Sequence, residues 1–143
     1  MVMGTLKLET DVAIIGGGPG GYVAAIRAAD LGKDVILIDE REQLGGVCLL
    51  EGCIPSKALI NAVSVAESAQ TGEQFGLTFD NVKFDHRKLR GFADSVVSGL
   101  SQGVDTLLRS RQIEVITGWA RFAGKKLIHV EGGPQIEFKQ AII

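Results

Sequence analysis

The two cysteines of the chain, Cys48 and Cys53, are separated by four residues in the segment GGVCLLEGCIPSKAL. Thiols at such a spacing can bind a metal, form a structural disulfide or act as a redox pair. A closed zinc site needs a tetrahedral set of ligands. The only histidines, His86 and His129, lie far from the cysteines in sequence and lack ligand spacing. We therefore expect no metal site.

A structural disulfide is also disfavoured here, because closing so short a loop contributes only about 2 kcal/mol. Cytosolic proteins also seldom keep such bonds oxidised. Pro55 and the helix-forming run ALINAVSVAESAQ follow Cys53, so a helix is predicted to begin at the thiols. The N-terminus of that helix, together with Lys57, would stabilise a thiolate. These features favour a redox pair.

A second candidate site is the glycine turn within TDVAIIGGGPGGYVAAIRAADLGKDVILIDE. Residues 12–15 and 35–38 are short apolar runs typical of strands buried in a parallel sheet, and the string from Tyr22 favours a helix between them. The glycines of the turn, three of them in G-x-G-x-x-G spacing, are Gly16, Gly18, Gly20 and Gly21. In this context they predict backbone N–H groups and a helix N-terminus that bind the pyrophosphate of a dinucleotide.

Two acidic residues, Asp39 and Glu40, end the second apolar run, 18 and 19 residues after Gly21. In dinucleotide-binding proteins a carboxylate about 20 residues beyond the glycine turn binds the ribose hydroxyls. Strand alternation puts neighbouring side chains on opposite faces, so only one of the two can reach the ribose. We predict Asp39 in that role, because it directly follows the apolar run.

The composition is that of an ordinary soluble globular domain, with 15 Lys and Arg against 17 Asp and Glu and 45% hydrophobic residues. The net charge of −2 gives no field that would attract nucleic acid or anionic lipid. The N-terminal residues lack the apolar core of a secretion signal, and no apolar run reaches the roughly 18 residues of a membrane span. We expect a cytoplasmic protein with no nucleic-acid or membrane partner.

The second half of the chain continues the α/β pattern. Residues 84–110 are predicted to form one amphipathic helix, and residues 113–116 a third buried strand. The segment TGWARFAGKKLIHVEGGPQIEFKQ alternates like a small antiparallel meander, in which Trp119 is expected to be a partly buried packing residue. The helix stripe is expected to pack in the core, and its members are Leu89, Phe92, Val96, Leu100, Val104 and Leu107.

The motifs GGGPGGYVAAIRAADLG and GGVCLLEGCIPSKAL together resemble the N-terminal flavin domain of the pyridine nucleotide-disulfide oxidoreductases, most closely the dihydrolipoamide dehydrogenases. The resemblance spans essentially the whole chain. It implies an α/β fold with a Rossmann-like parallel sheet, flanking helices and a small antiparallel β-meander, as in the FAD-binding domain of the glutathione reductase type. It also implies that residues 1–143 form one incomplete FAD-binding domain, with the NAD-binding and dimerisation domains absent.

The resemblance assigns roles to individual residues around FAD. The glycine turn at Gly16, Gly18, Gly20 and Gly21 would bind the pyrophosphate and Asp39, with Glu40 beside it, the adenosine ribose. Gly45 and Gly46 would line the flavin side, Lys57 would lie near flavin N5, and the backbone at Ala120 would touch the adenine end.

The same resemblance assigns roles to the two thiols. Cys48 resembles the thiol attacked by the dithiol substrate, and Cys53 the thiol that passes electrons to the flavin. The implied substrate is the dihydrolipoyl group of a 2-oxo acid dehydrogenase complex, oxidised by NAD in a homodimer of the full-length family.

Two departures from the family motif are visible. The usual asparagine and valine between the cysteines are replaced by Leu50 and Glu51, which adds a negative charge beside the sulfurs. The ribose acid is commonly a glutamate, which is one carbon longer than Asp39. A glutathione or mercuric reductase and a catalytically inert FAD-binding fragment therefore remain alternatives.

Overall fold

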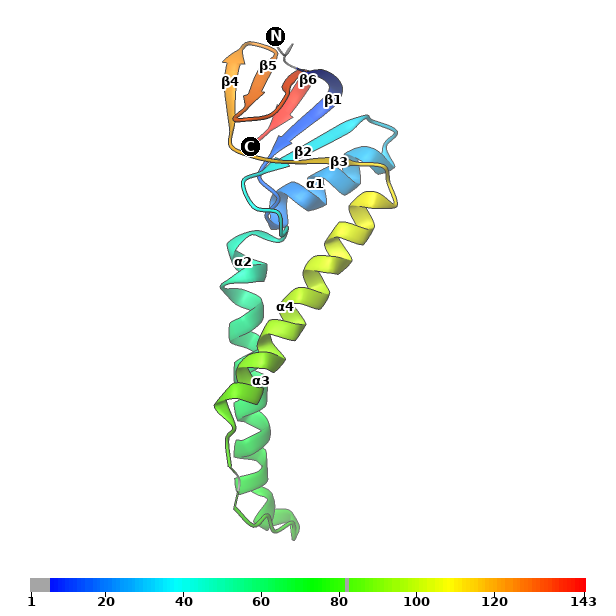
Figure 1. Cartoon of the computed structure of the whole chain (residues 1–143). Coiled ribbons are helices and arrows are strands. Elements are labelled where there is room, and N and C mark those ends of the chain that lie inside the picture. The colour runs from blue at the N-terminus through cyan, green and yellow to red at the C-terminus, as the bar shows by residue number, and fades with distance from the viewer. Residues whose placement is uncertain (1–5, 82) are drawn as a thin grey trace.

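The computed structural model describes residues 6–81 and 83–143. At one end of the molecule lies a six-stranded sheet with the order β3-β2-β1-β6-β5-β4 (Figure 1). The first three strands in the chain, β1, β2 and β3, are parallel to one another, and β6 runs parallel to β1. The strands are β1 (Lys7–Ile15), β2 (Val35–Asp39), β3 (Glu114–Thr117), β4 (Ala120–Gly124), β5 (Leu127–Val130) and β6 (Gln135–Ile142).

The apolar runs recognised in the sequence form the centre of this sheet. Val12 pairs with Val35 and Ile15 with Ile38, so β1 and β2 lie in parallel register, as the βαβ pattern predicts. Side chains of β1 and β2 are buried on both faces because helices cover one face and the meander covers the other. The expected Rossmann-like sheet with a β-meander is thus confirmed.

The last strand, β6, is inserted between β1 and the meander. It pairs in parallel with β1 from Lys7 and Gln135 to Ile14 and Ile142, and antiparallel with β5. The two-stranded β4–β5 hairpin then extends the sheet on that side. This arrangement joins the meander to the parallel strands in one continuous sheet.

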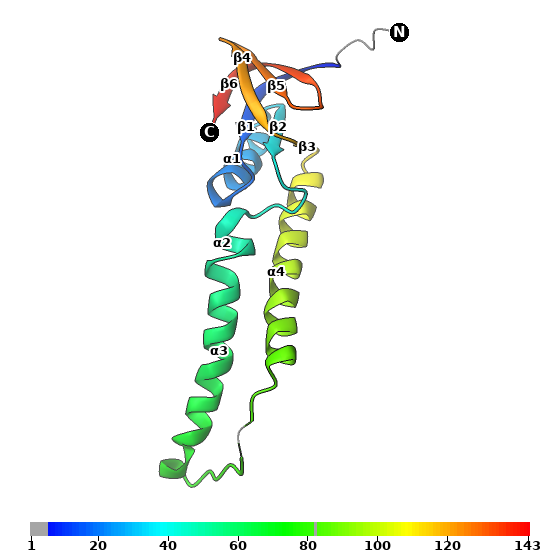
Figure 2. The ribbon, with the colours of Figure 1, turned by 60° about the vertical axis from the view of Figure 1, so that its left-hand side comes forward.

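Two long helices leave the sheet as a hairpin (Figures 1 and 2). They are α3 (Cys53–Gln70) and α4 (His86–Arg109), and they pack along each other. A short 3-10 helix, η1 (Gly72–Phe75), lies near the end of the hairpin that is distant from the sheet. The helices closer to the sheet are α1 (Pro19–Asp30) and α2 (Gly46–Leu50).

Helix α4 confirms the predicted amphipathic helix, but the expected core stripe is partly wrong. The residues that are buried on α4 are Ala93, Ser101, Val104 and Leu108. By contrast, the predicted stripe residues Phe92, Leu100 and Leu107 are exposed. Periodicity identifies an apolar side of a helix, whereas the neighbouring elements decide which part of that side is covered. The buried side of α4 is therefore offset from the predicted stripe and includes the small side chains of Ala93 and Ser101.

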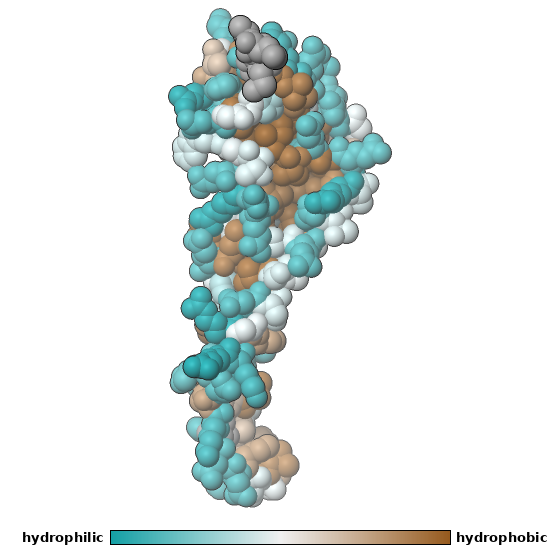
Figure 3. Space-filling model, viewed as in Figure 1, coloured by the Kyte–Doolittle hydropathy of each residue, from teal (hydrophilic) through white to brown (hydrophobic). Residues whose placement is uncertain are grey.

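Segment Gly46–Gln70 has the length and composition of a membrane span, contrary to the expectation that no segment reaches this length. In the fold it is two helices, α2 and α3, interrupted at residues 51–52 and linked by a disulfide. Several of its apolar side chains are exposed on the hairpin, where Figure 3 shows apolar patches among polar ones. A broken helix pair packed against α4 is the arrangement of a helical hairpin, not of one continuous span.

One buried polar contact fixes the loop before α2 against α4. The hydroxyl of Ser101 donates a hydrogen bond of 2.7 Å to the carbonyl oxygen of Leu44. Both residues are buried, at 5% and 4% relative exposure. Because the bond joins residues far apart in sequence, it holds the segment leading to Gly45 in place.

Replacing Ser101 with alanine leaves the Leu44 carbonyl without its buried donor, so we expect a loss of about 1–3 kcal/mol in the free energy of unfolding. Urea denaturation followed by circular dichroism measures it. Ser95→Ala is the matched control, because the Ser95 hydroxyl is exposed and bonds only to Phe92 of the same helix. Its effect should stay within about 0.5 kcal/mol. Equal losses in the two variants would contradict a role for the Ser101 bond.

Candidate functional site

The glycine turn closes the carboxyl end of β1. Gly16 has φ of 105°, a conformation that favours glycine, and its N–H donates to the carbonyl oxygen of Ile38 at 2.7 Å. Helix α1 begins directly after it, with Gly18 as N-cap and proline as its first residue. The first-turn amides of Gly20 and Gly21 have no partner within the helix, so they are available to an anion.

Gly21 is required by close packing inside the turn. A Cβ at this position would overlap the carbonyl oxygen of Gly16. A Cβ at Gly20, in contrast, would meet nothing within 4 Å. The third glycine of the spacing therefore brings the helix against the strand, as the fingerprint predicts.

Helix α2 starts in contact with the same turn. Gly45 N–H donates to the carbonyl oxygen of Gly17 at 3.0 Å. A Cβ at Gly46 would lie 2.7 Å from the Cα of Gly18, so the two backbones approach closely and position 46 requires a glycine. Both Gly45 and Gly46 have positive φ, at 128° and 62°. The start of α2 is thereby held on the predicted pyrophosphate site.

The cysteines lie on the two helices that follow this contact. Cys48 is in α2 and Cys53 is the first residue of α3, with a Cα–Cα distance of 4.8 Å. They form a disulfide. Cys48 is half-buried and Cys53 is exposed. The bond therefore sits at a helix N-terminus, two residues beyond the Gly18–Gly46 contact on the Cys48 side.

A pocket of about 290 Å³ opens where the parallel strands end. Ligands in open α/β sheets bind at the carboxyl ends of strands, and this pocket has that position. Five predicted residues line it, namely Gly16, Asp39, Glu40, Gly46 and Ala120. The other lining residues are Ile15, Ile38, Arg41, Val47, Gly118 and Trp119.

Asp39, in the wall of this pocket, is held in place by backbone donors. Gly17 N–H donates to Asp39 Oδ2 at 2.5 Å, and Arg41 N–H donates to Asp39 Oδ1 at 2.8 Å. Each carboxylate oxygen has a further lone pair for a hydroxyl. Glu40 also lines the pocket, although it is exposed. Strand alternation does not separate the two acids, because β2 ends at Asp39 and alternation no longer applies beyond it.

Other predicted residues lie outside this pocket. The turn beside the pocket contains Gly18, Gly20 and Gly21. Gly45 directly precedes Gly46 as the N-cap of α2. Lys57 is exposed on α3, one turn after Cys53. The pocket reaches Val47, the neighbour of Cys48 in sequence, so it ends next to the disulfide helix.

Two residues of the pocket wall, Trp119 and Arg41, were not expected there from the sequence. The prediction of a partly buried packing role for Trp119 is wrong, because this residue is 60% exposed and lies beside Ala120 in the wall. The sequence could have predicted this position, because Trp119 adjoins the expected adenine contact at Ala120 and aromatic side chains can stack on bases. Arg41 lines the same pocket, and only the folded loop after β2 brings it there.

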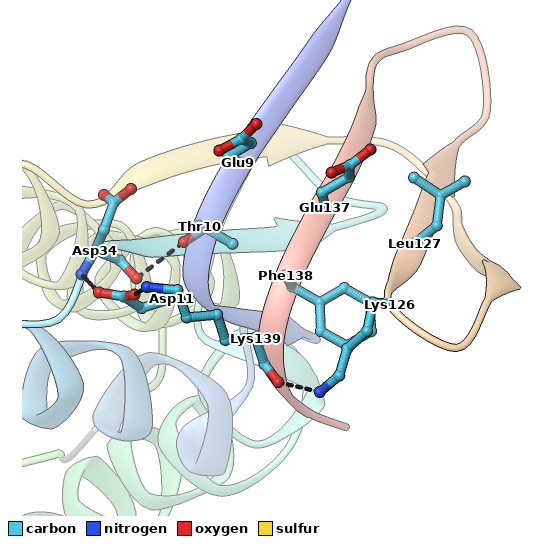
Figure 4. Close-up of a pocket in the computed structure, with 9 residues that line it drawn as sticks. All are labelled: Glu9, Thr10, Asp11, Asp34, Lys126, Leu127, Glu137, Phe138 and Lys139. Carbon is cyan, nitrogen blue, oxygen red and sulfur yellow. Dashed lines mark hydrogen bonds and ion pairs between the residues drawn. The ribbon is translucent and has the colours of Figure 1, made fainter.

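A larger cavity of about 510 Å³ lies towards the amino end of β2 (Figure 4). Two of its charged groups pair with each other, since Lys139 Nζ donates to Asp11 Oδ1 at 2.6 Å, and Lys126 Nζ donates to the Lys139 carbonyl. The Lys139 bond holds the pKa of Asp11 below its usual value and raises the pKa of Lys139. This cavity lacks the glycine turn, so it is not the dinucleotide site.

The fold and the site together define a dinucleotide-binding α/β domain that carries a disulfide beside its pyrophosphate turn. The donors suit FAD, because the first-turn amides of α1 have no partner within the helix and would bind its diphosphate, and the Gly18–Gly46 approach leaves backbone, not side chains, beside them. Residues 10–143 match the family described as pyridine nucleotide-disulphide oxidoreductase. The chain belongs to this family.

Three similar curated proteins are named dihydrolipoyl dehydrogenase. The chain is 44% identical to a dihydrolipoyl dehydrogenase of Geobacillus stearothermophilus, 47% to that of Bacillus subtilis and 43% to that of Halobacterium salinarum. Each comparison covers the whole chain but only 31% of the relative. The chain thus spans about a third of the length of the curated relatives that it matches.

Gly21→Ala should destabilise the chain by about 1–3 kcal/mol or more, because the added methyl group overlaps the Gly16 carbonyl and displaces the turn. Gly20→Ala is the matched control, since its methyl group meets nothing and alanine favours a helix by up to about 1 kcal/mol. Urea unfolding of both variants measures the difference. A Gly21→Ala variant as stable as Gly20→Ala would contradict the close packing.

Proposed function

We propose that the chain is the FAD-binding part of a dithiol–disulfide oxidoreductase of the dihydrolipoyl dehydrogenase type. The observation that carries this proposal is the contact between Gly18 and Gly46, which seats the disulfide-bearing helix on the pyrophosphate turn. A ligand bound through its diphosphate at this turn has the sulfurs of Cys48 and Cys53 close by. The names of the relatives agree with this reaction class.

The adenosine diphosphate part of FAD is assigned to the pocket at the strand ends. The amides of Gly20 and Gly21 and the dipole of α1 bind the pyrophosphate. Asp39, already oriented by two backbone donors, accepts hydrogen bonds from the adenosine ribose. Trp119 and the backbone at Ala120 flank the adenine end, and Gly45 and Gly46 face the flavin side.

The sulfur chemistry is assigned to the disulfide. A thiolate of the dihydrolipoyl group attacks Cys48 Sγ, the Cys48–Cys53 bond breaks and Cys53 leaves as a thiolate at the N-terminus of α3, which stabilises the charge. The second substrate thiol displaces Cys48, so the substrate leaves as a disulfide and the protein holds two thiols. FAD, when bound, would supply the two-electron oxidation that restores the disulfide, with NAD as the final acceptor in the longer protein.

The remaining functions belong to a protein of the relatives' length. NAD binding, the homodimer and docking to a 2-oxo acid dehydrogenase complex are proposed for that longer protein, and this chain for its FAD-binding domain, in the cytoplasm. Lys57 is assigned to the flavin N5 region. Its exposed position one turn into α3 leaves it free to face a ligand beside Cys53.

Adding FAD to the flavin-free chain should quench the fluorescence of Trp119, because the single tryptophan of the chain lines the proposed adenine site. A bound flavin should then lose its visible absorbance when a dithiol such as dihydrolipoamide is added without oxygen. Cys48→Ser and Cys53→Ser should bind FAD normally yet fail to pass electrons from the dithiol, because neither retains the disulfide.

Three results would redirect this proposal. A chain that neither quenches nor binds FAD, with two freely titrating thiols, is an inert fragment. If both cysteine variants still lose their flavin absorbance when the dithiol is added, the assigned sulfur chemistry is contradicted. Rapid reduction of glutathione disulfide or mercuric ion by a protein of the relatives' length, without oxidation of dihydrolipoamide, would favour a sister enzyme.

A further inference from the structure

An ion pair links the dinucleotide pocket to the disulfide loop. Arg41 Nη1 lies 2.6 Å from Glu51 Oε1, with side-chain exposures of 38% and 57%. Arg41 belongs to the loop after β2 and lines the pocket, whereas Glu51 lies between Cys48 and Cys53. The ion pair therefore connects the dinucleotide pocket to the loop between the two cysteines.

Backbone contacts hold both partners in place. Arg41 N–H donates to Asp39 Oδ1 at 2.8 Å, which ties the arginine to the proposed ribose acid. Glu51 is the C-cap of α2 and donates its N–H to the Val47 carbonyl at 2.9 Å. The ion pair thus joins two segments that hydrogen bonds hold in place, and one of them is the short loop between the cysteines.

The charge of Glu51 has a direct chemical consequence for this loop. Reduction of the disulfide creates a group that can become a thiolate, and a nearby carboxylate disfavours that negative charge. A guanidinium bonded to the carboxylate offsets the repulsion and itself favours the thiolate. Lys57 is the other cationic side chain close in sequence, one turn into α3. Arg41 is the cation that contacts Glu51.

We propose that Arg41 is a positioning residue that, through Glu51, sets the reduction equilibrium of the Cys48–Cys53 disulfide. The inference rests on the redox part of the proposed function and not on flavin binding. Removing the arginine charge leaves Glu51 uncompensated and favours the oxidised pair. Removing the glutamate charge leaves Arg41 unpaired beside the loop between the cysteines and favours the reduced pair.

The expected size is modest because both side chains are partly exposed to solvent. Exposed ion pairs of this kind change equilibria by about two- to fivefold, and salt screens the effect. The decisive property is the sign. An electrostatic role moves the two single variants in opposite directions, whereas a purely structural brace moves them in the same direction.

The test equilibrates the flavin-free 143-residue chain at neutral pH with mixtures of reduced and oxidised dithiothreitol. The reagent dithiol gives two electrons and two protons to the protein disulfide, yielding two protein thiols and the cyclic disulfide of the reagent. Alkylation of thiols and mass measurement give the reduced fraction. Arg41→Gln should lower the reduction constant about two- to fivefold, and Glu51→Gln should raise it by a similar factor.

Two further variants serve as controls. Arg41→Lys keeps the positive charge and should restore most of the equilibrium of the unaltered chain. Arg90→Gln removes an arginine that pairs with Asp94 at 3.7 Å near the start of α4, and it should leave the equilibrium unchanged. The difference between Arg41→Gln and the unaltered chain should shrink at high salt.

Shifts of the same sign in Arg41→Gln and Glu51→Gln, or no shift in either, overturn the inference and leave the proposed function standing. A shift in Arg90→Gln as large as that in Arg41→Gln also overturns it. If no dithiothreitol ratio reduces the disulfide of the unaltered chain, the proposed redox function fails, and this inference fails with it. Opposite shifts with rescue by lysine establish the inference.

Discussion

The structure depends on the meeting of two backbones at Gly18 and Gly46. A side chain at Gly46 would collide with the Cα of Gly18, so the helix of Cys48 can start on the glycine turn only because Gly46 has none. The hydrogen bond from Gly45 to Gly17 and the buried Ser101 hydroxyl on Leu44 secure the same junction. The two functions proposed for this chain, anion binding and thiol exchange, therefore share one small region of backbone.

Much of this arrangement follows from local sequence. The apolar runs that become β1 and β2, the glycine spacing and the paired cysteines are short-range patterns, and each produced the expected element. Packing across the molecule is not encoded in such patterns. The exposure of Phe92 and Leu107, the pocket position of Trp119 and the approach of Arg41 to Glu51 depend on which surfaces the fold brings together. These features become visible only in the tertiary structure.

The ion pair also changes the meaning of the departure in the cysteine loop. From sequence, Glu51 is an added negative charge beside two sulfurs. In the structure that charge is held by Arg41, a residue beyond the proposed ribose acid. Family membership and the similarity to dihydrolipoyl dehydrogenases establish the domain type, and within that frame the charge added by Glu51 is paired with a positive charge.

The place of β6 bears on how the chain acquires its shape during synthesis. Residues 135–142 complete one side of β1, with partners such as Leu8 and Ile136 separated by most of the chain. Pairing between residues so far apart in sequence slows folding, because the entropy of closing the long loop is lost before the stabilising contacts form. On the ribosome, β1 can meet β2 early, yet its other flank stays unpaired until residues 135–142 have emerged. Until then this edge of β1 is exposed to chaperones and to mispairing.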